Sequence, residues 1–451
     1  MTPRKIASLL VAVALVGAAA WRFAAPGQSR DGGGSLDQAV AKIRGTRSTM
    51  MPTDQAIRYF ELRIVDDPQD FISETYLCEL HQRRARETGD ATHFAEAEAA
   101  ARRALKLNPH YTEATGWLAA SCAAQHKFDE ALELARKAVA SDGRAQGALI
   151  IVGDALMGLG RYTEAEQAYR ELERSANSPA VAARLAHLHE LRGNYDEALR
   201  LIEAAAKALL DQREPKEEVA WYQSLLGDLY FETGRLESAA EHFTAALRIF
   251  GDYHVALAGL GKVRAAEGQL DEAIELYKQA AESSPLVSTL ATLGDLFVRR
   301  GDRTTAQLYF DRVESIAAKP GPSQDLHRRD LSLFLADHDL DPSRSLSLAE
   351  VDFATRKDIF AYDTLAWALY KNSRLDEASA AIGEALKLGG RQPSLCFHAG
   401  MIYYGRGEND KARTYLKRAI ALNPRFAVLY ADEARRTLAK LGERTDSSTG
   451  G

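Results

Sequence analysis

The feature that most restricts the fold of this chain is a set of three residues that recurs at fixed spacing. In each copy a glycine is followed twelve residues later by an alanine, and four residues after that by a bulky side chain. A spacing that persists over so much of a chain predicts a repeated unit rather than one globular core. The copies are Gly153–Ala165–Tyr169, Gly227–Ala239–Phe243, Gly261–Ala273–Tyr277, Gly294–Ala306–Phe310 and Gly400–Ala412–Leu416.

The clearest unit runs from Trp221 to Tyr253 and predicts two short amphipathic helices folded against each other. Leucines and a tyrosine before Gly234 share one helical face, and a second apolar face follows that glycine. Gly227 and Ala239 are small where the two helices would lie closest. Such a hairpin leaves apolar faces uncovered, so it requires similar hairpins on either side.

Glycines that would end the first helix of each unit recur along the chain. A glycine tolerates the positive φ that a helix C-terminus often requires. Several gaps between these turn glycines are 33 or 34 residues, and the sequence therefore predicts helix almost everywhere. The turn glycines are Gly160, Gly193, Gly234, Gly268, Gly301 and Gly407.

These residues resemble the tetratricopeptide repeat, whose pattern places a Leu-Gly-x2-Tyr core, alanine, an aromatic, alanine and a closing proline within one unit. The matches are Leu226-Gly227-x2-Tyr230 with Ala239, Phe243 and Ala246; Leu260-Gly261 with Ala273, Tyr277, Ala280 and Pro285; and Gly400-x2-Tyr403 with Ala412, Ala419 and Pro424. The resemblance covers residues 37–426. It implies an all-α fold, a right-handed α-solenoid of about ten helical hairpins. Residues 427–441 are predicted to be a capping helix.

Domain boundaries follow from departures from the repeat. The solenoid is predicted over residues 37–442 and a disordered tail over 443–451. Residues 321–358 lack the glycine and alanine marks and are predicted to form a divergent pair of helices. An insertion at 211–218 predicts a longer helix or a projecting loop.

The N-terminal segment has the layout of an export signal. Arg4 and Lys5 precede an uncharged run over residues 6–21, which predicts a signal peptide or an N-terminal transmembrane anchor within residues 1–25. A glycine-rich linker follows over residues 26–36. An uncleaved anchor would make this a single-pass membrane protein whose C-terminal domain lies outside the cytoplasm. A cleaved signal would give a periplasmic or secreted protein.

The sequence offers no pattern of catalysis. A net charge of −6 argues against a nucleic-acid binder, which would carry a concentrated basic surface. There is no phosphate-binding glycine loop and no Gly-x-Ser-x-Gly elbow. The three cysteines lack the spacing of a disulfide framework or a zinc site and are predicted to pack in the core. We expect no enzyme activity, no cofactor, no metal and no small-molecule substrate.

Two short segments contain residue types that bind metals. The histidines of the segment at 187–190, His-Leu-His-Glu, point apart on a helix and cannot share an ion. The aspartates at 337, 339 and 341 lack the glycine and glutamate of a calcium loop, and a helix terminus before Pro342 explains them.

The resemblance implies that the first helices of successive hairpins line a groove that holds a protein or peptide partner. Carboxylates beside aromatic rings at such positions would favour a basic peptide. The same aspartates would equally suit the solvated side of an amphipathic helix. The candidate ligand-binding residues are Asp154, Trp221, Asp228, Phe231, Asp295 and Tyr404.

The sequence therefore favours a non-enzymatic protein–protein interaction scaffold that binds its partner outside the cytoplasm. A structural spacer without a specific ligand is the alternative. A third hypothesis is an enzyme with an unrecognised site near residues 321–358, where the repeat rule is broken.

Overall fold

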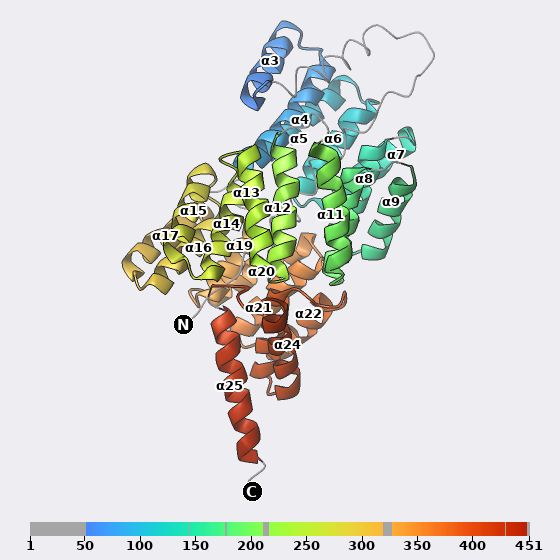
Figure 1. Cartoon of the computed structure of the whole chain (residues 1–451). Helices are drawn as coiled ribbons and strands as arrows, with labels where there is room; N and C mark the ends of the chain where they lie inside the picture. The colour runs from blue at the N-terminus through green and yellow to red at the C-terminus, as the bar shows by residue number, and fades with distance from the viewer. Residues whose placement is uncertain are drawn as a thin grey trace. The chain divides into compact units, whose positions relative to one another are not determined.

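The computed structural model describes residues 51–143, 145–175, 178–210, 216–318, 327–428 and 430–448. Within these ranges the chain forms helices α3–α17 and α19–α25 and no strand (Figure 1). The predicted all-α repeat fold is confirmed. The predicted signal or anchor and the glycine-rich linker lie outside the described residues. No helix of the described residues is long and apolar enough to cross a membrane.

Most of the helices pair in chain order as hairpins, preceded by α3 and followed by α25. The first helix of each hairpin is usually followed after three or four residues by the second. The helices are α3 (Thr53–Asp66), α4 (Phe71–Thr88), α5 (Thr92–Leu107), α6 (Thr112–Ala124), α7 (Phe128–Ser141), α8 (Gln146–Gly158), α9 (Tyr162–Ser175), α10 (Pro179–Leu191), α11 (Tyr195–Leu210), α12 (Lys216–Glu232), α13 (Leu236–Ile249), α14 (His254–Glu267), α15 (Leu270–Ser283), α16 (Val287–Arg300), α17 (Arg303–Ala317), α19 (Arg328–Asp337), α20 (Pro342–Thr355), α21 (Ile359–Lys371), α22 (Leu375–Ala385), α23 (Pro393–Gly405), α24 (Asn409–Leu422) and α25 (Tyr430–Ser448).

The described residues form two compact units. The N-terminal unit comprises residues 51–185 and 203–219, and the C-terminal unit comprises 186–202 and 220–448. Helices α10, α11 and α12 each contribute residues to both units.

The repeated glycines are fixed by the bulky residues that follow them. A Cβ added to Gly261 would lie 2.7 Å from Cδ2 of Tyr277, and one added to Gly227 would lie 2.8 Å from the ring of Phe243. Real Cβ atoms essentially never approach other atoms this closely. The glycines at 153, 294 and 400 face Tyr169, Phe310 and Leu416 in the same way. Each glycine therefore makes room for the side chain sixteen residues later, and the predicted helix–helix contact is confirmed.

The predicted turn glycines all have left-handed backbone conformations. Their φ angles run from 70° at Gly160 to 90° at Gly301. Two hairpins that lack a glycine use another residue in the same conformation: His126 between α6 and α7, and Ser373 between α21 and α22, each with φ 60°. The turn geometry is thus common to these hairpins even where the glycine is absent.

The divergent segment forms the predicted pair of helices, α19 and α20. Asp339 has a φ of 51° and takes the turn position. Ser332 and Ser345 lie where a regular hairpin has its glycine and alanine, and both are fully buried. Each serine hydroxyl donates to the other's carbonyl oxygen at 2.8 Å. A hydroxyl pair therefore replaces the small-residue contact in this hairpin.

The C-terminal helix α25 covers the last hairpin, α23–α24, through the buried residues Tyr430, Ala431, Ala434 and Leu441. It continues to Ser448, past residue 443 where the sequence predicted a disordered tail to begin. The insertion near residue 211 lengthens α11 and α12 on either side of it, while residues 211–215 lie outside the described residues.

Candidate functional site

In the N-terminal unit, the predicted groove residue Asp154 lies in a buried ion pair. Arg184 donates from Nε and Nη2 to the two carboxylate oxygens of Asp154, each at 2.7 Å. The hydroxyl of Tyr169 donates to the same carboxylate at 2.6 Å. Asp154 is 4% exposed and Arg184 is 2% exposed. The carboxylate is therefore satisfied inside the protein and does not face an open groove.

In the C-terminal unit, two further predicted aspartates have internal partners. Asp295 is fully buried, and one of its oxygens lies 2.8 Å from Nε2 of His338. The other ring nitrogen of His338 lies 2.7 Å from the carbonyl oxygen of Phe334. Both ring nitrogens of His338 therefore face oxygen atoms.

Asp228 accepts a hydrogen bond from Lys262 Nζ at 2.6 Å. Burial raises the pKa of this carboxyl group, although Lys262 opposes the shift. Lys262 also lies 4.5 Å from the centre of the Phe231 ring, a cation–π distance. Two of the predicted residues, Asp228 and Phe231, are thus brought together around a lysine that the sequence did not single out.

These contacts share one pattern, which we call the inter-repeat ladder. A polar residue on the first helix of one hairpin bonds to a residue on the first helix of the next, or directly after that helix in the case of His338, 30 to 43 residues later. Such bonds fix the orientation of neighbouring hairpins. The members are Asp154–Arg184, Asp228–Lys262, Asp295–His338, Asp337–Trp367 and Asp363–His398.

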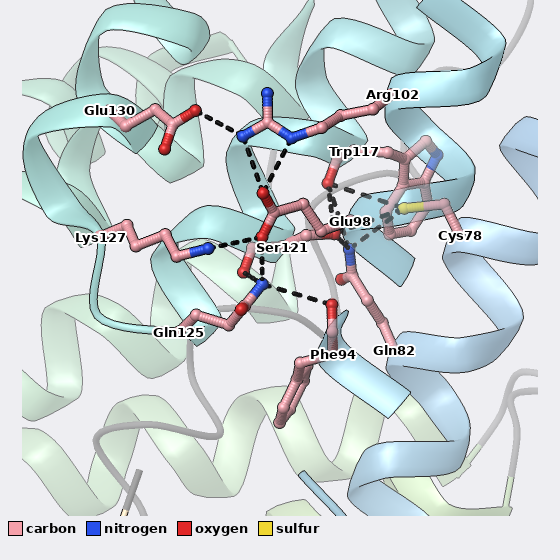
Figure 2. Close-up of polar contacts among 10 residues, drawn as sticks. All are labelled: Cys78, Gln82, Phe94, Glu98, Arg102, Trp117, Ser121, Gln125, Lys127 and Glu130. Atoms are coloured by element: carbon pink, nitrogen blue, oxygen red, sulfur yellow. Dashed lines mark hydrogen bonds and ion pairs between the residues drawn. The ribbon is translucent and has the colours of Figure 1, made fainter. Parts of the chain in front are cut away.

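The N-terminal unit has a neutral counterpart of the ladder, shown in Figure 2. Gln82 of α4 donates to Ser121 Oγ at 2.8 Å and to the carbonyl oxygen of Trp117 at 3.2 Å, both on α6. The thiol of Cys78 lies in the same cluster, 3.4 Å from Ser121 Oγ. Burial raises the pKa of Cys78 to about 12, so this thiol stays protonated at neutral pH. The cluster is structural.

Figure 2 also shows a second set of contacts around Glu98. Its carboxylate accepts hydrogen bonds from Arg102, Gln125 and Lys127, the last two at 2.7 Å. Burial opposes ionisation, but these donors outweigh it and lower the pKa of Glu98. Arg102 also donates a hydrogen bond from Nη2 to Glu130 Oε1 at 2.7 Å. The set joins α5 to α6 and α7 and leaves Glu98 no role as a proton donor at neutral pH.

The three predicted aromatic residues differ in exposure. Trp221 and Phe231 are 3% and 1% exposed, whereas Tyr404 is half-buried. Buried rings contribute to packing, so Trp221 offers no surface to a peptide. The proposed preference for a basic peptide loses its basis, because the carboxylates that would attract it are bound internally. The ladder partners were missed since they lie a full repeat away in sequence.

In the C-terminal unit, the segment 423–428 lies across the C-terminal ends of earlier first helices. Asn423 Nδ2 donates to the carbonyl oxygen of Phe231 at 2.7 Å, at the end of α12. Arg425 donates to Ala266 O at the end of α14. Arg299 of α16 donates to Val428 O at 2.9 Å. The chain thus satisfies helix-terminal carbonyl groups with its own later residues.

A pocket of about 360 Å³ lies between this segment and the helix ends. Phe231, Ala265 and Ala266 supply part of its apolar lining. Four cationic residues and two carboxylates line it, which gives an excess of positive charge. We call it the C-terminal pocket; its charged residues are Lys262, Arg299, Arg425, Arg435, Glu267 and Asp432.

The divergent hairpin contains a buried ionic cluster. Arg356 donates from Nη2 to Asp358 Oδ2 at 2.8 Å. Asp358 also accepts from the backbone N–H groups of Phe360 and Ala361, which begin α21. Arg329 lies 4.0 Å from Asp358. These groups stabilise the hairpin and the N-terminus of α21. In the same hairpin, the hydroxyl groups of the buried Ser332 and Ser345 donate to each other's carbonyl oxygens.

In the two segments that contain metal-binding residue types, 187–190 and 337–341, side chains form hydrogen bonds or ion pairs within the protein. Asp337 accepts hydrogen bonds from Trp367 at 2.7 Å and from Tyr430. Asp341 caps α20 by accepting from Arg344 N at 2.9 Å, with Pro342 in the first helical turn, as predicted. His187 pairs with Glu190 at 3.0 Å. The three cysteines are buried and free, as predicted.

Family models match much of the chain. Tetratricopeptide repeat models match residues 83–146, 121–182, 176–252, 224–287 and 393–426. The chain belongs to the tetratricopeptide repeat family. The matched residues include both units and omit the divergent hairpin. Members of this family are recognised by their packing residues, so membership establishes the architecture and leaves the ligand open.

A similar curated protein is anaphase-promoting complex subunit 3 of Schizosaccharomyces pombe. It is 28% identical over 173 residues, which cover 38% of this tetratricopeptide repeat chain and 25% of that protein. The chain therefore matches about a quarter of that relative's length.

Solved structures are also similar. Yeast Tom70 covers 92% of this chain with 95% of its own, at 13% identity and a TM-score of 0.37. A tetratricopeptide repeat protein from Parabacteroides merdae covers 59% of this chain with 99% of its own, at 16% identity and a TM-score of 0.33. Likeness at this level carries no argument about function.

Proposed function

We propose that this tetratricopeptide repeat protein is a non-enzymatic scaffold that binds an acidic segment of a partner protein at the C-terminal pocket. The observation that supports this most is the excess of cationic side chains around a partly apolar hollow. Three of the arginines, at 299, 425 and 435, are exposed and lie at its edge.

The charges of the pocket are arranged to receive a carboxylate. Lys262 is paired with Asp228, and Arg435 is paired with Asp432 at 2.8 Å. Arg299 and Arg425 donate instead to backbone carbonyl oxygens. Because a carbonyl group is neutral, these hydrogen bonds do not neutralise the charges of the two arginines. A guanidinium group binds a carboxylate with two parallel hydrogen bonds. Pro424, Ala427 and Val428 also line the pocket and are exposed or half-buried, so they offer apolar surface to the partner's neighbouring side chains.

The test is binding of labelled peptides to the folded C-terminal unit within the full chain, measured by fluorescence anisotropy. An acidic peptide rich in Asp, Glu and Leu should bind, and its Lys-rich counterpart should not. Arg299→Glu with Arg425→Glu should abolish binding. Arg312→Glu with Lys417→Glu, two exposed cations on the second helices α17 and α24, is the matched control. Equal binding of both peptides, or loss with the control pair, contradicts the proposal.

We further propose that the protein acts outside the cytoplasm, on the basis of the sequence of residues 1–25. Membrane fractionation and N-terminal sequencing of the mature protein distinguish an anchor from a cleaved signal. Recovery of the intact N-terminus in the cytosolic fraction would contradict this location.

A further inference from the structure

Two histidines and a glutamate from the two helices of the first hairpin, α4–α5, lie close together. His81 projects from α4, while His93 and Glu96 lie one turn apart on α5. The Nδ1 atoms of the two histidines are 3.2 Å apart. Glu96 Oε2 lies 3.0 Å from Nδ1 of His81 and 2.6 Å from Nδ1 of His93. Among the residues described, no other set of three or more such ligands gathers this closely.

Hydrogen bonding alone does not satisfy this triangle. If both Nδ1 atoms carry protons toward the carboxylate, the two N–H groups face each other. If one Nδ1 atom is bare, its lone pair faces the carboxylate oxygen. With an ionised Glu96, every distribution of protons on the two histidines therefore leaves at least one of the three contacts between two donors or two acceptors. A cation at the centre would accept a lone pair from all three atoms.

The spacing of the two histidine nitrogens suits a tetrahedral metal. Zinc bonds of about 2.0–2.2 Å to imidazole nitrogen and carboxylate oxygen place neighbouring ligand atoms about 3.3–3.6 Å apart. The two Nδ1 atoms, 3.2 Å apart, come close to this spacing, whereas Glu96 Oε2 lies nearer to them, at 3.0 and 2.6 Å. The side chain of Glu96 is 50% exposed, so it has room to move outward when an ion binds. Three ligands also leave a fourth position open.

The surroundings suit a metal rather than a buried ion pair. The side chains of His81 and His93 are 12% and 22% exposed, so an ion reaches them from solvent. The nearby cation Arg103 is neutralised by Glu74 through two hydrogen bonds of 2.7 and 2.8 Å.

We propose that His81, His93 and Glu96 form a divalent transition-metal site, with zinc as its ion. Two imidazoles and a carboxylate are ligands that zinc accepts readily. The bound ion would join the middle of α4 to the first turn of α5. Its fourth position would hold water or a side chain of a partner.

The experiment uses the tag-free full chain, stripped with a chelator and titrated with zinc by calorimetry. We expect one zinc ion per chain, a higher melting temperature with zinc, and visible absorption from a four-coordinate cobalt complex. His81→Ala or His93→Ala should weaken binding at least about tenfold, since loss of even an outer-shell partner costs that much. Glu96→Gln changes a half-exposed side chain and should leave folding undisturbed, so weaker zinc binding by this variant reports the loss of a ligand.

Two histidines serve as controls in the same titration. His110 is exposed in the N-terminal unit. His187 has the same spacing to a glutamate, but in the described part of the chain it belongs to no set of three converging ligands. His110→Ala and His187→Ala should bind zinc as the unaltered chain does. The proposal is overturned if no saturable zinc binding occurs, or if binding survives the combined loss of His81 and His93.

Discussion

The regular hairpin α14–α15 and the divergent hairpin α19–α20 bring two helices together by different means. In α14–α15, Gly261 makes room for the ring of Tyr277. In α19–α20, Ser332 and Ser345 meet through reciprocal hydrogen bonds, and the residue four after Ser345 is the small Ala349. The first arrangement is steric and the second is polar. The repeat therefore requires close approach of two backbones, and more than one pair of side chains permits it.

Both hairpins contribute to one apolar cluster. Ala273 and Tyr277 of the regular hairpin and Leu331 and Phe334 of the divergent one belong to the same set of buried residues. The divergent hairpin thus keeps the face that its neighbours need. It differs in its own helix–helix contact, in the Asp339 turn and in the charged residues around Asp358.

The largest expected effect on stability comes from removing the negative charge of Asp358. Asp358→Asn keeps an acceptor for the N-terminus of α21 but removes the carboxylate that Arg356 bonds. Breaking a buried ion pair of this kind costs about 3–5 kcal/mol of the free energy of unfolding. Urea unfolding followed by circular dichroism measures it. A change as small as that of an exposed ion pair would mean that the cluster is hydrated.

The same residue predicts a pH dependence. Burial raises the pKa of Asp358, but Arg356 and Arg329 outweigh it, and the net pKa is lowered. A carboxyl group with a lowered folded-state pKa stabilises the fold above its unfolded value of about 3.9, and this stability is lost as the pH falls through the folded value. Acid titration of stability should show this loss in the unaltered chain and a smaller one in Asp358→Asn.

The regular hairpin should be broken by filling its glycine position. Gly261→Leu would place a side chain against Tyr277 and cost at least about 1–3 kcal/mol. Gly383 of α22 is the matched control, because a Cβ there meets nothing within 4 Å. Gly383→Ala should stabilise the chain by about 0.5–1 kcal/mol through helix propensity. If the two variants melt at the same temperature, the steric account of the regular hairpin is wrong.

A smaller effect tests the polar arrangement. Ser332→Ala removes one of the two reciprocal hydrogen bonds and should cost about 1 kcal/mol. Ser345→Ala should cost the same, and a double-mutant cycle gives the coupling between the two hydroxyl groups. Coupling near zero would mean that the serines act only through their small size.

The turn residues should give the smallest effect. Asp339 accepts a hydrogen bond from Lys371 Nζ at 2.8 Å. Asp339→Gly converts the divergent turn into a regular one. The relief of positive φ is offset by the entropy of glycine and by loss of the Lys371 contact, so stability should change by less than about 0.5 kcal/mol. Ser373 is exposed and also at positive φ, and its side chain carries no charge that could form an ion pair. Ser373→Gly should stabilise by about 0.5 kcal/mol. Thermal melts of both variants measure the difference, and destabilisation by Ser373→Gly would contradict the assigned turn.

The fold could be predicted because its rule is local. Gly261, Tyr277 and their equivalents lie within one repeat, and their spacing is visible in the chain. The candidate site could not be predicted in the same way. Whether Asp154 faces a ligand depends on Arg184, and the equivalent question for Asp295 depends on His338, each a repeat or more away. His93 and Glu96 have a readable helical spacing, but only the structure brings His81 to them.

The bond from Asn423 to the end of α12 also constrains how the chain acquires its structure. A solenoid whose hairpins touch only their neighbours is able to form in order of synthesis. Here Asn423 bonds Phe231, and the side chain of Tyr195 bonds Arg391, across 192 and 196 residues. Bringing together ends so far apart costs loop-closure entropy and slows folding. The C-terminal unit therefore reaches its final form only after α24 has left the ribosome, and its early hairpins await their last partners until then.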